Sequence, residues 1–187
     1  MNTNLLACEH RVNLDGKPVF RSLEVALKNP AEVERLHLKK KKLKAIPPEV
    51  FLFTNLLELD LSGNRIELIP EEIARLKNLK VLNISNNRIH TVSDSIRSLS
   101  RLEIMDLSRN YINTFPPQIQ HLKSLTCLII WKNEVGRLPD EIAALKDNIK
   151  YLDIRHNPYP PENIQILEGL LPDTTILKTR HCACNDG

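Results

Sequence analysis

The residues of this chain that could do chemistry are few and scattered. Four cysteines could supply a nucleophile or metal ligands: Cys8, Cys127, Cys182 and Cys184. Cys127 is embedded in patterned sequence, but no histidine can be placed beside it as the base of a catalytic thiol. Cys182 and Cys184 lie next to His181 in a polar tail that offers no fourth zinc ligand. We therefore expect no catalytic thiol, no metal and no disulfide, and a reducing, cytoplasmic environment.

Three aspartates, Asp60, Asp106 and Asp153, recur at one position of a repeated pattern. They fall in alternate repeats, so in a parallel sheet of successive repeats consecutive members lie two strand steps, about 10 Å, apart. That is beyond the separation of the carboxylates in a paired-carboxylate glycosidase, so we interpret them as a solvated polar column. The sequence also contains no glycine-rich phosphate loop, no H-E-x-x-H and no G-x-S-x-G. We expect neither enzymatic activity nor a cofactor or small-molecule substrate.

Composition and charge narrow the class of protein further. Leucine and isoleucine make up 48 of the 187 residues, which excludes intrinsic disorder. No apolar run approaches the roughly 18 to 20 residues of a membrane span, so we expect a soluble chain. We also expect a monomer. The net charge of +3 is concentrated in residues 35–44, which hold six cations and no acid. Nucleic-acid binding is therefore disfavoured, whereas a local electrostatic patch is left open.

The N-terminus carries one targeting signal to consider. Leu5, Leu6, Ala7 and Cys8 are similar to the end of a bacterial lipoprotein signal, in which the cysteine is lipidated. Only seven residues precede Cys8, none of them Lys or Arg, and there is no apolar region of the usual length. The signal fails as the chain stands; export or surface anchoring is the alternative if the true N-terminus lies upstream.

A repeat decides the fold. Asparagines recur after a short Leu/Ile alternation at intervals of 23, 23, 23 and 24 residues: Asn64, Asn87, Asn110, Asn133 and Asn157. The alternation predicts one short strand per repeat with one buried face. The Asn follows where the chain turns inward, and its amide can satisfy backbone groups of neighbouring coils. A following Pro-x-x-I-x-x-L segment predicts a short helical turn behind the strand.

The pattern L-x-x-L-x-L-x-x-N-x-L resembles the leucine-rich repeat family, in its short 23-residue bacterial class, over about residues 19–179. The resemblance implies an α/β, right-handed solenoid with a curved parallel sheet on the concave face and short helices or 3-10 turns on the convex face. We expect an N-terminal tail (1–18), a helical cap (19–32), about six repeats (33–157), a helix–strand cap (158–179) and a C-terminal tail (180–187).

The concave face is the candidate binding surface, because side chains at the third, fifth and seventh positions of each repeat point away from the buried leucines. In repeats four to six this face is apolar, with polar residues at its rim. We predict a protein-binding site there, comprising Ile104, Asp106, Cys127, Ile129, Trp131, Tyr151, Asp153 and Arg155. The alternative is a structural role in which Trp131 packs over the extra residue near Asp147 or over the C-terminal cap.

We therefore predict a non-enzymatic scaffold that binds a protein partner, as the resemblance also implies. Two alternatives stay open. The basic stretch 35–44 could dock an anionic membrane surface or a nucleic acid, or the chain could be a regulatory subunit of a larger complex.

Overall fold

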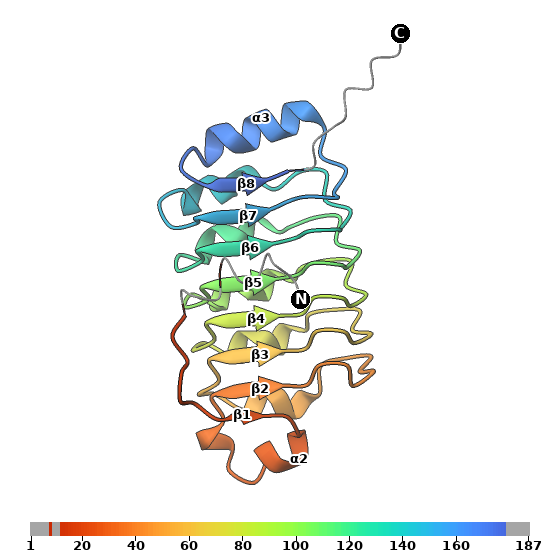
Figure 1. Cartoon of the computed structure of the whole chain (residues 1–187), viewed down its shortest axis with the longest axis vertical. Coiled ribbons are helices and arrows are strands. Elements are labelled where there is room, and N and C mark those ends of the chain that lie inside the picture. Colours follow the sequence, from red (N-terminus) through yellow and green to blue (C-terminus); the bar gives the residue numbers. More distant parts are fainter. Residues whose placement is uncertain (1–7, 9–11, 179–187) are drawn as a thin grey trace.

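The computed structural model describes Cys8 and residues 12–178, and these residues form one parallel sheet (Figure 1). Its strands follow one another in chain order, each paired in parallel with the next. They are β1 (Val19–Phe20), β2 (Arg35–His37), β3 (Glu58–Asp60), β4 (Val81–Asn83), β5 (Ile104–Asp106), β6 (Cys127–Ile129), β7 (Tyr151–Asp153) and β8 (Thr175–Leu177). Equivalent residues of successive repeats are therefore neighbours across the sheet, as in the register Ile104, Cys127, Tyr151.

Short helical segments connect the strands behind the sheet (Figure 1). Most of them begin at or just after a proline, because a fixed backbone φ favours the first helical turn. The 3-10 turns are η1 (Pro30–Glu32), η2 (Pro48–Leu52), η3 (Glu71–Arg75), η4 (Asp94–Ser98), η5 (Pro117–His121) and η6 (Asp140–Leu145). The predicted solenoid of strands in front and 3-10 turns behind is confirmed.

The core is a continuous column of aliphatic side chains between the sheet and the 3-10 turns. Each coil contributes inward residues from its strand and its turn, such as Leu59, Leu61, Ile66 and Ile73, all fully buried. The cluster extends from Ala26 to Leu171. Since each fully buried Leu or Ile contributes about 1.5 to 3 kcal/mol, stacking of coils is the main source of stability.

The asparagine ladder satisfies the backbone where the chain turns into the core. Asn110 is typical: its Oδ1 accepts the Ile89 N–H at 3.0 Å, and its Nδ2 donates to the carbonyl oxygens of Ile84 and Leu107 at 3.0 and 2.9 Å. Asn64, Asn87, Asn133 and Asn157 repeat this geometry between their own pairs of coils. Each amide thus links two adjacent coils.

The departures from the repeat are accommodated locally. Lys41 occupies the ladder position of the first coil, and its backbone N–H donates to Asn64 Oδ1 at 2.8 Å. Ser93 replaces the proline before η4, where its hydroxyl accepts the Ser95 N–H and caps the turn. The extra residue near Asp147 follows η6, which is one residue longer than η5, on the convex side.

Both ends of the solenoid are closed by a helix and a strand. Ser22 caps α2 (Leu23–Ala26), a short helix within the predicted helical cap of residues 19–32. The strand β1 within this cap was not expected; it pairs with β2 and extends the sheet by one strand. At the other end α3 (Pro161–Leu170) and β8 lie close to the predicted positions, and Asn163 Nδ2 donates to the Gly136 carbonyl.

No helix within Cys8 and residues 12–178 is long and apolar enough to cross a membrane.

Asn110→Ala is expected to lower the free energy of unfolding by about 1 to 3 kcal/mol, because it leaves buried backbone groups of three residues without their hydrogen-bond partner. Lys41→Ala is the control: this exposed side chain lies in the ladder register but makes no ladder contact, and its backbone N–H keeps its bond to Asn64. Urea unfolding monitored by circular dichroism measures both. Equal losses at the two positions would contradict a ladder that begins at Asn64.

Candidate functional site

The concave face of β5 to β7 brings the predicted binding residues together. Ile104, Cys127 and Tyr151 form one row across the three strands, and Asp106, Ile129 and Asp153 form the next. Trp131 and Arg155 follow the ends of β6 and β7. The repeat register alone therefore places all eight predicted residues in one surface region, although whether that region binds a protein stays a prediction.

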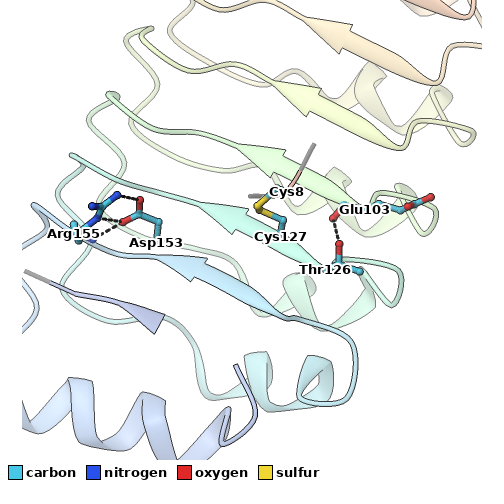
Figure 2. Close-up of a disulfide and its surroundings, with 6 residues drawn as sticks. All are labelled: Cys8, Glu103, Thr126, Cys127, Asp153 and Arg155. Atoms are coloured by element: carbon cyan, nitrogen blue, oxygen red, sulfur yellow. Dashed lines mark hydrogen bonds and ion pairs between the residues drawn. A yellow bond between two sulfur atoms is a disulfide. The ribbon is translucent and has the colours of Figure 1, made fainter. Parts of the chain in front are cut away.

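A disulfide between Cys8 and Cys127 lies at the centre of this region (Figure 2). The two cysteines are 119 residues apart in sequence, and their Cα atoms are 6.0 Å apart. The expectation of no disulfide is therefore wrong for Cys8 and Cys127. Four irregularly spaced cysteines form no disulfide framework, and the expectation of no disulfide rested on that. The criterion does not apply to a single long-range disulfide.

Cys8 covers much of the apolar surface that the sequence predicts to be open. Ile104, Cys127 and Ile129 are 1%, 0% and 0% exposed and form a small second core with Cys8. Val12, Val81, Trp131 and Tyr151 pack against its border. We call this second core and its border the concave patch. Its centre is a floor beneath Cys8 and Val12, and its partly exposed rim consists of Trp131, Tyr151 and Arg155.

Trp131 is only partly buried and is held by its neighbours. The Arg109 guanidinium lies over the indole at 4.8 Å from the ring centroid, a cation–π distance. The His156 ring approaches edge-on at 6.0 Å between centroids. The indole is thus oriented from both sides along the solenoid, and it remains available at the surface as a rigid aromatic group.

The aspartate column differs from the solvated column that the sequence suggests. Asp60, Asp106 and Asp153 are 8%, 1% and 0% exposed, so that interpretation is wrong for all three. Asp153 is neutralised by Arg155, whose Nε and Nη2 donate to its two oxygens at 2.9 and 2.6 Å (Figure 2). Asp60 lies 3.5 Å from Lys39 Nζ.

Asp106 has no such cation among the residues the structure describes; its Oδ1 accepts the Ser108 backbone N–H at 2.9 Å. Burial raises the pKa of Asp106 to about 6, despite that hydrogen bond, and the nearby charges of Asp60 and Asp153 add to the effect. The carboxyl group therefore titrates near pH 6.

An open groove of about 910 Å³ over β2 to β5 is lined by both charged and aliphatic side chains, among them Arg35, Glu58 and Leu14. At its centre Glu58 accepts from Arg35 Nε at 2.5 Å and lies 2.7 Å from His37 Nε2. Burial raises the pKa of Glu58, but the hydrogen bonds and charges of His37 and Arg35 outweigh it and hold the pKa below the usual value. Arg35 also donates to the carbonyl oxygens of Leu14 and Lys17, fixing the segment before β1. The sequence analysis did not predict this network. Charged residues of opposite sign in adjacent repeats could have indicated it.

No cluster of three or more His, Cys, Asp or Glu side chains that could hold a metal occurs in the described part of the chain. Cys182, Cys184 and His181 lie outside the described residues.

The comparisons with known proteins can now be set beside this geometry. The family model described as "Leucine rich repeat" matches residues 31–89 and 77–135, which together exceed half of the chain. The chain is a leucine-rich repeat protein. No protein with a curated description matches it in sequence.

Solved structures of other leucine-rich repeat proteins are similar to this one. A leucine-rich repeat protein of Leptospira interrogans superposes with a TM-score of 0.70 at 26% identity, covering 87% of this chain and 47% of that one. The leucine-rich repeat ectodomain of the Arabidopsis thaliana receptor kinase GASSHO1/SCHENGEN3 superposes with a TM-score of 0.69 at 28% identity, covering 87% of this chain and 20% of that one. The chain thus spans less than half the length of either structure. Members of this family are typically non-enzymatic.

Cys8→Ser is expected to lower the free energy of unfolding by about 2 to 4 kcal/mol, because a long-range cross-link restricts the unfolded chain. Urea unfolding of the oxidised protein, with Cys182→Ser as the matched control beyond the described residues, measures the difference. Mass spectrometry of an unreduced digest should find the Cys8 and Cys127 peptides joined. Identical unfolding midpoints with and without reductant would contradict a structural role for the bridge.

Asp106→Asn is expected to stabilise the protein at pH 7 by about 1 to 3 kcal/mol. Because the pKa of Asp106 is raised in the folded state, the folded protein binds the proton more tightly, and stability falls as pH rises from about 4 to about 6. The amide side chain that replaces the carboxyl group carries no charge and removes this decline. Unfolding free energies measured between pH 4 and pH 7 test the effect, and an unchanged pH slope in the variant would contradict it.

Proposed function

We propose that this leucine-rich repeat chain is a non-enzymatic recognition module that docks a protein partner over the rim of the concave patch, with Trp131 as the anchor. The observation that carries the proposal is the partly exposed surface of Trp131, Tyr151 and Arg155, where a preoriented indole lies beside the buried apolar floor of coils four to six. Such surfaces, with a polar rim, are typical of protein-binding hot spots.

The burial of the patch centre changes the predicted site without removing it. Ile104, Cys127 and Ile129 form a floor that already holds Cys8 and Val12. We therefore propose that a partner contacts Trp131, Tyr151 and Arg155, with Asp153 holding the Arg155 guanidinium from below. Asp106 lies beneath this surface and contributes through its charge rather than through contact.

Rigidity supports binding at this place. The strands are fixed by the ladder and by inter-coil hydrogen bonds such as Arg109 N–H to the Trp131 carbonyl at 2.8 Å. The indole is oriented before any partner arrives, so docking costs little side-chain entropy.

The relatives favour the same class of function. The leucine-rich repeat fold commonly mediates protein–protein interaction. The Arabidopsis ectodomain was solved in complex with CASPARIAN STRIP INTEGRITY FACTOR 2. Neither observation names a partner for this chain, since fold alone does not fix function.

The disulfide bears on the compartment in which this function operates. Disulfides persist in oxidising environments and are rare in the cytoplasm, so we propose export rather than the cytoplasmic location that cysteine content suggested. A lipidated Cys8 could not form this bridge, which separates the disulfide from the anchoring alternative.

The electrostatic alternative loses part of its basis in residues 35–44. Arg35 is engaged by Glu58, and Lys39 lies beside Asp60, so two of the six cations are paired with acids. Docking of a whole membrane or nucleic-acid surface through this stretch alone is therefore the weaker proposal.

Trp131→Ala is expected to weaken partner binding by about 30-fold, the usual effect of truncating an aromatic anchor. The wild-type protein captures the partner from an extract of its source cells, and the affinity of the purified partner is then measured by calorimetry. Leu52→Ala is the matched control, because this side chain is 53% exposed on the turn η2 behind the sheet, away from the concave patch. Equal losses in the two variants, with unchanged circular dichroism, would overturn the assignment of Trp131.

A further inference from the structure

The turns at the carboxyl ends of the strands place two columns of residues along one edge of the sheet. The ladder asparagine of each coil points inward, so the residues before and after it point outward. The column before the ladder position contains Lys40, Gly63, Asn86, Arg109, Lys132 and His156. The column after it contains Lys42, Arg65, Arg88, Tyr111, Glu134 and Pro158. We call Lys40, Lys42, Arg65, Arg88, Arg109 and Lys132 the basic edge.

A shared backbone conformation aligns the first column. Lys40, Asn86, Arg109 and Lys132 all have a left-handed φ, between 55° and 57°, and Gly63 has a φ of 70°. The backbone N–H group of each of these residues donates to a carbonyl oxygen of the next coil, one residue before the equivalent position. The Lys40 N–H group, for example, donates to the Ser62 carbonyl oxygen at 2.9 Å. Gly63 leaves the space next to Lys40 open, since a Cβ there would lie 3.1 Å from Lys40 Cγ.

The charges of the basic edge are not neutralised by acids. All six side chains are exposed, and within residues 12–178 none of them is in an ion pair. By contrast, Arg35, Lys39 and Arg155 on the concave face each lie against a carboxylate. Glu134 is the one acid in the two columns, at the far end of the row.

A groove of about 430 Å³ runs between the basic edge and the concave face. Lys40 and Arg109 lie at its two ends, and Ser62, Ser85, Asn86 and Ser108 line it between them. These ends are three coil steps apart, roughly 14 Å, which is the span of about four extended residues. The groove therefore combines cations with polar side chains over the length of a short peptide.

We infer that the partner presents an acidic polypeptide segment, rich in Asp or Glu, that binds along the basic edge. This inference rests on the proposed function and names the chemistry of the partner. The two surfaces meet at one contact, because Arg109 belongs to the basic edge and stacks on Trp131, the proposed anchor. An acidic segment in the groove is thus continuous with an apolar contact on the rim.

A polypeptide fits this edge better than other anions. Single-stranded nucleic acids bind by stacking successive bases on a row of open aromatic faces. Near this edge Arg109 covers one face of Trp131 and His90 stacks on Tyr111 at 5.4 Å, so the described part of the edge presents no such row. A planar membrane surface would contact the protruding cations and leave the polar side chains within the groove unused.

The test uses a fluorescein-labelled oligoglutamate peptide of about eight residues and measures anisotropy at low and physiological ionic strength. An oligoglutamine peptide of equal length, single-stranded oligothymidylate and phosphatidylserine-containing vesicles are the comparison probes. The double variant Arg65→Glu/Arg88→Glu reverses charge on the basic edge in coils two and three without touching Arg109 or Trp131. Arg75→Glu/Arg97→Glu is the matched control, since it makes the same change on the exposed turns η3 and η4 of the same two coils.

We expect oligoglutamate to bind the wild type and the control alike, and the edge variant about 10-fold more weakly, because each exposed ion pair contributes roughly 0.2 to 1 kcal/mol. Oligoglutamine should not bind. Equal weakening in both double variants, or absent oligoglutamate binding, would overturn the inference. Edge-dependent binding of oligothymidylate or vesicles that exceeds that of oligoglutamate would assign the edge to those anions instead. Binding of the captured partner by Trp131→Ala and by the edge variant separates this inference from the proposed function. If Trp131→Ala loses partner binding and the edge variant keeps it, the proposed function stands and only the acidic segment is rejected.

Discussion

The structure depends on one constraint: each coil must turn back into an apolar core directly after its strand, which buries backbone amides and carbonyls. A buried asparagine at that turn accepts from the preceding coil and donates both to that coil and to its own, as Asn110 does with Ile89, Ile84 and Leu107. Without such a partner these groups would each cost free energy comparable to a lost hydrogen bond. The ladder fixes the register of the coils, and the register in turn stacks equivalent side chains into columns. The concave patch and the basic edge are both consequences of that stacking.

The two proposed recognition surfaces differ in the physical term they contribute. The concave patch offers apolar area and a preoriented indole, and the basic edge offers charge that is open to solvent. Arg109 joins them, because its guanidinium is held over Trp131 while its charge faces the groove. A partner that contacts both surfaces would gain affinity mainly from the concave patch. It would gain specificity and a faster association rate mainly from the basic edge.

The Cys8–Cys127 bridge gives the concave face two different halves. Over β5 to β7 the sheet carries a small second core, and Asp106 beside it is a buried carboxyl with a raised pKa. Over β2 to β5 the face is an open groove of charged and aliphatic side chains that contains the Arg35–Glu58–His37 network. The cost of burying the Asp106 carboxylate opposes the stability supplied by the stacked coils.

The repeat made most of the fold predictable from the sequence, because its determinants are local: alternation for each strand, Asn64 to Asn157 for the ladder, prolines for the 3-10 turns. The same periodicity placed Ile104, Cys127 and Tyr151 in one row, and the basic edge could have been found from the residues flanking each ladder asparagine. Only the tertiary structure decided what lies on that row. The pairing of Cys8 with Cys127 joins residues 119 apart, outside the repeat, and no local pattern encodes such a contact. The burial of Asp106 and the altered role of the patch centre arise in the same non-local packing, where side chains from different segments determine the environment that each residue experiences.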